Sequence, residues 1–393
     1  MKYNFLFALA LLLFVHSCKD EPPTKPVLPI PDPEPTLVYD TTSHNITWFA
    51  DTLGDYGQAL NDIWAADSVN FYAVGSINIS PNPNRPWRGI IKWNGSQWVD
   101  VPNIGYGESN ELSIGINAIF GFSNNNIWLA KAQRTTNGAG PGGLGFPFSH
   151  FNGIEWKTYY APFPSPSSSD IYNRYIYDMW GSDPNHLWAV GDSGLIYFWN
   201  GSVWRKQTVP QIVIDKAFDL NRVSGVSHNE VYAFGYNTFA ETVMLRLNGG
   251  IWEVVYLSRH LTSGQPSYLG NLHYGEWQMG NKVEKRLWLF ADNLYEWDRT
   301  VFPAMNWIPV EGFRLQGYGG GIASTKGSNV WVTNRKKMAH WNGVSWKKYD
   351  DVAPHLPANI FFERIAAKGK TVVAVGFNFD SFSRPYYLIG RQE

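Results

Sequence analysis

The feature that most constrains this chain is a short hairpin motif that occurs five times. Each copy places an Asn-Gly pair between apolar flanks and ends in tryptophan. The copies are KWNGSQW (92–98), HFNGIEW (150–156), FWNGSVW (198–204), RLNGGIW (246–252) and HWNGVSW (340–346). Asn-Gly is the strongest short-range signal for a two-residue turn between antiparallel strands, because such a turn requires positive φ angles. The repeats therefore predict an array of antiparallel hairpins.

A longer repeating unit surrounds each hairpin. Residues 178–204 read as four short strands, and the first half of the same pattern recurs at 62–75, 118–131, 222–235, 321–334 and 364–376. A degenerate copy lies between 272 and 307, where a longer segment replaces the Asn-Gly turn. The tryptophans of these units are 39 to 58 residues apart: Trp98, Trp156, Trp204, Trp252, Trp307 and Trp346. Four short strands at this period are typical of a β-propeller blade. We interpret the tryptophans as packing between blades, with stacking on sugars as the alternative.

The two ends of the repeat region complement each other. The last copy, 361–390, stops after its third strand, while 43–52 resembles a fourth strand without a blade. Pairing them would protect both strand edges. The sequence therefore predicts an all-β fold: a seven-bladed β-propeller over 42–393, with four antiparallel strands per blade, closed by an N-terminal strand that completes the C-terminal blade.

The first residues are typical of a targeting segment. Lys2 precedes an unbroken apolar run from Phe5 to Val15, which has signal-peptide length and is too short for a spanning helix. Val15-His16-Ser17-Cys18 resembles the lipobox of bacterial lipoproteins, although His16 departs from the usual small residue. Cys18 is the only cysteine in the chain, so no internal disulfide is possible. We predict a signal peptide over 1–17 and lipidation at Cys18.

A charged triplet and a proline-rich segment follow. Lys19-Asp20-Glu21 resembles the surface-export tag of Bacteroidota-type lipoproteins. Seven prolines between Pro22 and Pro35 favour extended polyproline II. Residues 18–41 are therefore predicted to be a semi-rigid tether, and the resemblance implies a lipid-anchored protein on the outer membrane, exposed at the cell surface.

Charge and motifs exclude several function classes. The chain has 32 basic and 33 acidic side chains, so it lacks the basic footprint of a nucleic-acid-binding protein. Residues 138–143 match GxGxxG, but they are predicted to lie between two strands and not before the helix that a dinucleotide site needs. We recognise no catalytic motif and expect neither a cofactor nor a metal. The sequence thus favours a binding protein over an enzyme.

Loop lengths distinguish the two faces of the predicted propeller. The turns between strands one and two and between three and four are short and share one face, which we call the short-turn face. The remaining connections are longer and define the long-loop face, and aromatic and arginine side chains on them are candidates for contacts with a partner. These candidates are Tyr106, Arg134, Tyr172, Arg174, Arg259, His260, Arg314, Tyr318, Arg335, Phe379 and Arg384. The strand at 45–49 must begin on the short-turn face, so the tether should attach there.

SHNITW, NDIWA, FYAVG and the repeated WNGxxW resemble a family of uncharacterised Bacteroidota-type propeller lipoproteins, often labelled "glucosyl transferase". The resemblance implies a surface propeller, expected to be monomeric. We favour a module that binds a glycan or protein through the long-loop face. The alternatives are a glycan-processing hydrolase, lyase or glycosyltransferase with its site in the central channel, and a scaffold for an outer-membrane complex.

Overall fold

The computed structural model describes 41–54, 58–77, 79, 88–101, 115–131, 139–140, 143–162, 175–239, 241–257, 287–290, 294–297, 306–307, 320–326, 329–378 and 384–393. Contacts divide the chain into two units, Met1–Val38 and Tyr39–Glu393, and the second unit holds the repeats. Within the described ranges, no helix has the length and apolar character needed to cross a membrane.

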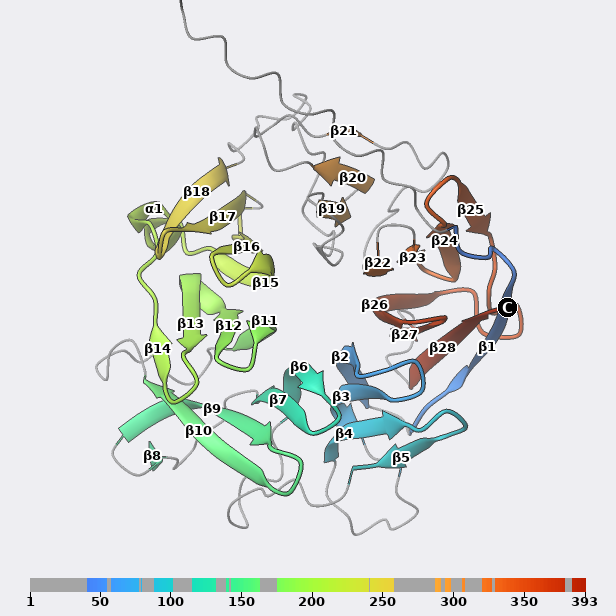
Figure 1. The fold of residues 1–393 in the computed structure, drawn as a ribbon, viewed down its shortest axis with the longest axis horizontal. Coiled ribbons are helices and arrows are strands. Elements are labelled where there is room, and N and C mark those ends of the chain that lie inside the picture. The colour runs from blue at the N-terminus through green and yellow to red at the C-terminus, as the bar shows by residue number, and fades with distance from the viewer. Residues whose placement is uncertain are drawn as a thin grey trace, which may run out of the picture. The chain divides into compact units, whose positions relative to one another are not determined.

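The described strands of the second unit form antiparallel sheets in chain order (Figure 1). Four sheets are β2–β5 (Ala59–Ala65, Phe71–Ile77, Arg88–Trp93, Trp98–Asp100), β11–β14 (Ile176–Asp183, His186–Gly191, Leu195–Trp199, Trp204–Lys206), β15–β18 (Asp219–Ser227, Glu230–Tyr236, Thr242–Asn248, Ile251–Leu257) and β22–β25 (Gly321–Lys326, Asn329–Asn334, Lys337–Trp341, Trp346–Tyr349). A fifth contains β6, β7, β9 and β10 (Ile116–Ser123, Asn126–Lys131, Gly143–Phe151, Trp156–Pro162), with β8 (Ala139–Gly140) paired to β9.

Two further sheets complete the set. One has three described strands: β19, β20 and β21 (Leu287–Phe290, Leu294–Trp297, Asn306–Trp307). The other joins the two ends of the unit: β26, β27 and β28 (Ile360–Lys368, Thr371–Asn378, Pro385–Gln392) with β1 (Ile46–Thr52). Six of the seven described sheets therefore contain four strands that are paired one after another across the sheet. The innermost strands contact one another in the order β22, β26, β2, β6, β11, β15, and Figure 1 shows them around a common centre. The prediction of an all-β propeller is confirmed.

Strand β1 is the outer strand of the C-terminal sheet. It pairs antiparallel with β28 from Ile46 opposite Gln392 to Thr52 opposite Tyr386. The predicted pairing of the N-terminal strand with the last sheet is therefore confirmed. Thr42 N–H donates to the carbonyl of Asn342 in the turn between β24 and β25, so the chain reaches β1 from the short-turn face, as expected.

The aromatic residues of the repeat pack between adjacent sheets. Trp204 stacks on Phe148 of the preceding sheet with ring centroids 4.0 Å apart. Trp98 lies against Tyr387 of the C-terminal sheet, 5.7 Å between centroids. On the inner strands, Trp64 covers Gly121 of the next sheet so closely that a Cβ there would lie 2.7 Å from the ring. These contacts confirm that Trp98 and Trp204 are packing residues.

The Asn-Gly pair does not form the predicted two-residue turn in any of the five copies. Trp93 pairs with Trp98, so the first loop has four residues instead of two, and the copies at 152, 200 and 342 share its hydrogen-bond pattern. The glycines have φ near 92–98°, but the asparagines do not have positive φ. Each asparagine instead accepts two backbone N–H bonds with its side-chain oxygen. In RLNGGIW, Gly249 and Gly250 do form a two-residue turn with positive φ at both positions.

This geometry gives a direct test of the asparagine's role. Asn200→Ala should lower the free energy of unfolding by about 1 kcal/mol, because Oδ1 accepts bonds from Ser202 N–H, Ser202 Oγ–H and Val203 N–H. Asn200→Asp retains the accepting oxygens and should lose much less. Denaturant unfolding of both variants measures the difference, and equal losses would show that the side-chain bonds are unimportant.

In the described part of the chain, two short helical segments lie outside the expected all-strand pattern. A 3-10 turn, η2 (Asp192–Gly194), connects β12 to β13, and α1 (Gln211–Asp215) connects β14 to β15. Val213 of α1 is buried in the core between the β11–β14 and β15–β18 sheets. The residues matching GxGxxG lie partly in β8 and β9, where Gly140 pairs with Gly143, so the described part of this motif belongs to a hairpin.

Candidate functional site

The structure describes two of the predicted contact residues, Arg335 and Arg384. The others lie outside the described residues: Tyr106, Arg134, Tyr172, Arg174, Arg259, His260, Arg314, Tyr318 and Phe379. The lipidation and export residues Cys18, Lys19, Asp20 and Glu21 also lie outside them.

Arg335 lies on the long-loop face but not on a long loop. It occupies a tight turn between β23 and β24 with φ 56°, so this connection is shorter than the sequence suggested. Its side chain is exposed, and the guanidinium carbon lies 5.0 Å above the centre of the Phe361 ring on the neighbouring sheet. The cation–π contact therefore joins the β22–β25 sheet to the C-terminal sheet on the long-loop face.

Arg384 immediately precedes β28 and is only partly accessible. Its Nε is among the buried nitrogen atoms. This burial makes Arg384 a weaker candidate for ligand contact than Arg335, because much of the side chain already packs within the protein.

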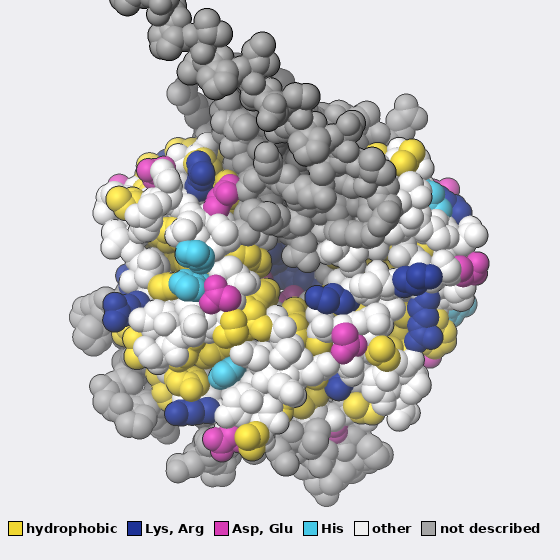
Figure 2. Space-filling model, in the orientation of Figure 1, with side chains coloured by type: hydrophobic (Ala, Val, Ile, Leu, Met, Phe, Trp, Pro, Cys, Tyr) yellow, Lys and Arg dark blue, Asp and Glu magenta, His cyan; other side chains and the backbone are white. Residues whose placement is uncertain are grey.

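The inner strands share an irregularity near their long-loop ends. One extra residue bulges from each of five inner strands: Asn61, Asn117, Tyr177, Asn221 and Glu363. A bulge turns successive side chains away from the regular alternation of a strand. Figure 2 shows the molecule hollowed at its centre, with basic and acidic atoms visible at depth. We refer to this central space as the channel.

Two aspartates beside these bulges join neighbouring sheets. Asp62 accepts N–H bonds from Ile63 and from Ile119 on β6, both 2.9 Å long. Asp178 repeats the arrangement, accepting from Met179 and from Val223 on β15 at 2.9 Å. Each carboxylate thus holds two inner strands together. The signal was present in the sequence, because Asp62 and Asp178 precede equivalent residues in DIWA and DMWG.

The third channel carboxyl, Glu363, is differently placed. It forms no hydrogen bond with any residue that the structure describes, and it is partly accessible. Desolvation raises its pKa to about 7, and the Arg222 guanidinium opposes this increase. Desolvation also raises the pKa of Asp62 to about 6 and that of Asp178 to about 7, again opposed by Arg222. Arg222 therefore influences all three carboxyls around the channel.

A tyrosine and aspartate cluster lies at the long-loop end of the channel, between β11 and β15. Asp192 accepts the backbone N–H of Tyr175 and the hydroxyl of Tyr177. Asp219 accepts Ser193 N–H at 2.9 Å. Burial, followed by the bond to Asp192, raises the pKa of Tyr177. We call Tyr175, Tyr177, Asp192, Asp219 and Tyr236 the mouth cluster. Its carboxylates accept bonds within the protein, and its partly accessible phenol rings are the groups suited to a sugar or a peptide side chain.

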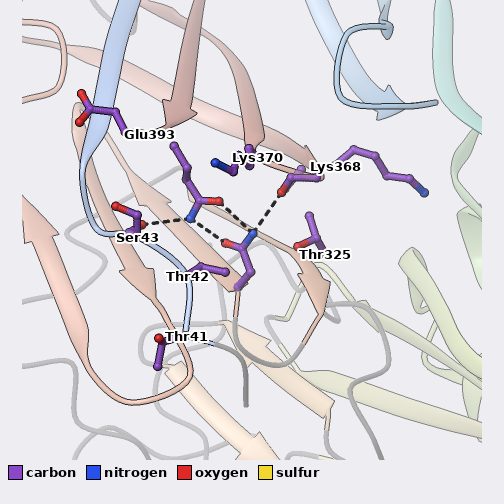
Figure 3. Close-up of a pocket in the computed structure, with 11 residues that line it drawn as sticks. Thr41, Thr42, Ser43, Thr325, Lys368, Lys370 and Glu393 are labelled. Carbon is purple, nitrogen blue, oxygen red and sulfur yellow. Dashed lines mark hydrogen bonds between the residues drawn. The ribbon is translucent and has the colours of Figure 1, made fainter.

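A cavity of about 590 Å³ lies on the opposite, short-turn face, where β1 joins the last sheet. Hydroxyl and lysine side chains dominate its lining: Thr41, Thr42, Ser43, Thr325, Lys368 and Lys370. Figure 3 shows the Lys368 side chain extending away from Glu393. The Glu393 carboxylate lies 3.4 Å from the hydroxyl of Thr47. The sequence did not indicate this cavity, because it forms only when residues from both ends of the chain come together.

The wall of this cavity is a buried network of amide and imidazole groups. Asn329 Nδ2 donates to Gln392 Oε1, and Gln392 Nε2 donates to the carbonyl of Ser43. His340 Nε2 lies 3.0 Å from Asn329 Oδ1, while its Nδ1 lies 3.0 Å from Nδ1 of His44. Both imidazole contacts are satisfied when the two rings are neutral, with His44 donating to His340 and His340 donating to Asn329. The network therefore fastens the start of β1.

The chemistry available at these sites is limited. Asp62 and Asp178 are already used by backbone N–H groups, which leaves Glu363 as the carboxyl free to exchange a proton with a substrate. Among the described residues, no group of three or more His, Cys, Asp or Glu side chains could hold a metal ion. Glycoside hydrolysis normally uses two suitably spaced carboxyls, and Glu363 is the candidate for one of them.

No family model matches this chain, and no curated protein matches it. Solved propellers resemble it in fold. YCF48 bound to D1 peptide has a TM-score of 0.54 at 13% identity, covering 90% of this chain and 99% of that one. YCF48 from Cyanidioschyzon merolae has a TM-score of 0.54 at 14% identity, covering 88% and 98%. The WD40 propeller domain of Doa1 has a TM-score of 0.50 at 10% identity, covering 90% and 97%.

Proposed function

We propose that this chain is a surface lipoprotein whose propeller binds a protein or glycan ligand at its long-loop face. The observation that carries the proposal is the chemical difference between the two faces. On the short-turn face, asparagine side chains satisfy the backbone of the turns. On the long-loop face, Arg335 is exposed over Phe361, and the phenol rings of the mouth cluster are partly accessible. Exposed arginine and tyrosine contribute strongly to many interfaces.

The ligand class follows from the mouth cluster and from the fold. Partly accessible tyrosine rings can pack against the face of a sugar or against a peptide side chain. YCF48 is described as bound to a D1 peptide. By analogy of fold alone, a peptide segment is a reasonable ligand here. A glycan remains the second member of the proposed class.

We further propose that the propeller has seven blades. The three described strands β19, β20 and β21 follow one another as strands two, three and four of a blade would. Trp307 of β21 pairs with Tyr295 of β20, so the last tryptophan of this copy also lies on a strand paired to the preceding one. The degenerate copy of the repeat in the sequence between 272 and 307 would then be the seventh blade, between β18 and β22.

The anchor is proposed from the sequence and from the position of β1. Lipidation of Cys18, with Lys19-Asp20-Glu21 as the export tag, would hold the protein at the outer membrane with its body outside the cell. Because the chain reaches β1 from the short-turn face, the tether attaches opposite the proposed binding face. A ligand could then reach the long-loop face from the medium.

A second candidate function is glycan processing in the channel. The specific observation in its favour is Glu363, whose pKa of about 7 would let it donate and accept a proton near neutral pH. Against it, Asp62 and Asp178 are engaged between strands. The "glucosyl transferase" label of the resembling family belongs to this candidate.

The proposal is tested with the full chain by glycan and peptide arrays together with a hydrolysis screen. Arg335→Ala should weaken ligand binding about tenfold or more. Lys157→Ala is the matched control, because Lys157 also lies over an aromatic ring, Tyr159 at 5.2 Å, but on the outer strand β10. Equal binding by both variants would contradict a long-loop site. Product release that Glu363→Gln abolishes would support the second candidate instead.

Lipidation is tested separately by cell fractionation. Cys18→Ala should move the protein out of the outer-membrane fraction, because acyl chains on Cys18 supply the proposed anchor. The control is Ser17→Ala, which retains a small residue before Cys18 and should leave fractionation unchanged. If Cys18→Ala fractionates like the parent protein, the anchor is wrong.

A further inference from the structure

Aliphatic side chains project from the turns of the short-turn face. The exposed fractions of five such residues range from 46% to 90%: Val69, Ile154, Val203, Ile251 and Val344. We call them the turn-tip residues. They come from five different sheets, and half of the exposed large hydrophobic residues in the described part of the chain belong to this set.

The repeat places these residues at similar positions along the axis of the propeller. Ile154, Val203, Ile251 and Val344 lie in the hairpins between third and fourth strands, which Figure 1 shows at the outer edge of the ring. Val69 lies in the turn between β2 and β3 and is close enough to Gly95 to contact a Cβ placed there. Since equivalent turns of a propeller end on one face, their tips are arranged to touch a flat surface together. A concave or narrow partner would not meet all of them.

The same face carries free positive charge and receives the N-terminal segment. Lys368 and Lys370 are exposed beside the cavity, and neither forms an ion pair with a described residue. Thr42 is hydrogen-bonded to the turn that contains Val344. The segment that precedes Thr42 contains Cys18, the proposed site of lipidation.

We propose that the short-turn face rests on the lipid bilayer, with the turn-tip residues inserted at the interface and Lys368 and Lys370 beside anionic headgroups. This inference depends on the proposed lipid anchor and adds an orientation to it: the body lies on the membrane and is not held away from it by the proline-rich tether. Apolar side chains and lysines on one face are the usual elements of peripheral membrane binding. The long-loop face then points directly away from the bilayer.

The test uses the lipidated full chain in vesicles that contain anionic phospholipid and nitroxide-labelled lipid. Ile154→Cys supplies a free thiol for an environment-sensitive dye, because Cys18, the only native cysteine, is acylated. Phe239→Cys is the matched control, since Phe239 is 71% exposed and lies between β16 and β17 at the opposite end of those strands. We expect quenching at position 154 to exceed that at position 239 at least threefold.

A second pair of variants separates docking from anchoring. In the chain labelled at 154, Ile251→Asp with Val344→Asp should at least halve the quenching, whereas Ile214→Asp, an exposed position on α1, should leave it unchanged. Vesicle flotation reports the anchor independently. Flotation with equally weak quenching at 154 and 239 would overturn the docking proposal while leaving the anchor intact. Absence of flotation would overturn both.

Discussion

Trp48→Ala is expected to lower the free energy of unfolding by about 3 kcal/mol, at the lower end of the range for removing a large core aromatic because Trp48 is partly exposed. Its ring covers Gly390 so closely that a Cβ there would collide with it. The ring also packs edge-on against Trp331 at 6.0 Å and Tyr349 at 5.3 Å in the adjacent sheet. Deleting 43–50 should be more severe, since it also removes most of β1 and the His44 and Ser43 bonds. Denaturant unfolding measures both.

The adjacent residue provides the control for this prediction. Phe49 lies on the same strand but is 52% exposed. Phe49→Ala should therefore change the free energy of unfolding by less than about 1 kcal/mol. If both substitutions had the same effect, the strand pairing alone, and not the packing of Trp48 between sheets, would stabilise the closure.

Acidification should weaken the same closure through His340. The side chain is fully buried and stacks on Trp331 at 4.0 Å, and burial followed by the proximity of His44 lowers its pKa to about 3. In the unfolded chain its pKa is about 6.5. Between these values the unfolded chain binds a proton that the folded chain does not, so stability decreases as the pH falls from about 6.5 towards 3. At about 1.4 kcal/mol per pKa unit, the full loss is on the order of 4 to 5 kcal/mol.

The channel carboxyls act in the opposite direction. Their pKa values are raised in the folded protein, so protonation of Glu363 or Asp178 stabilises the fold as the pH falls through about 7. The informative quantity is therefore the difference between variants. The free energy of unfolding of His340→Phe should decrease less between pH 7 and pH 4 than that of the parent protein.

Phenylalanine is a suitable replacement because the fold already uses it at the equivalent position. Phe198 stands opposite Trp188, as His340 stands opposite Trp331. His150→Phe in the β6–β10 sheet is the matched control: His150 stacks on Trp128 and its pKa is lowered to about 4, but it does not contact β1. His150→Phe should also reduce the loss of folding stability at low pH, but it should leave the pairing of β1 with β28 unaffected. Identical pH dependence in the parent and His340→Phe would contradict the prediction.

The repeat made the architecture predictable, since hydrophobic periodicity and turn residues recur in each unit. The pairing of β1 was also predictable, because the last copy lacks a fourth strand and 43–52 supplies one. The turn type was not. Two kinds of loop share the letters Asn-Gly: a four-residue loop closed by an asparagine side chain, and a two-residue loop with positive φ at asparagine. Only the observed pairing of Trp93 with Trp98 distinguishes the two.

For the candidate site, the sequence indicated a face but not how its residues are arranged. Loop length indicated which face varies, yet it did not reveal that Arg335 occupies a tight turn over Phe361. Asp62 and Asp178 could have been found by aligning the repeats, whereas Glu363 could not, because it stands one residue earlier on a bulge. Arg222 unites these carboxyls only in three dimensions, where four inner strands meet.

The position of β1 also has a consequence for biogenesis. Thr47 on this strand meets Glu393, 346 residues later, so the first strand of the body finds its partner only after the last one has been synthesised. Until then, 46–52 has no partner strand while the intervening sheets assemble. Contacts of such long sequence separation form slowly. Folding of the ring is therefore expected to end with the pairing of β1, the first strand to be synthesised, with β28.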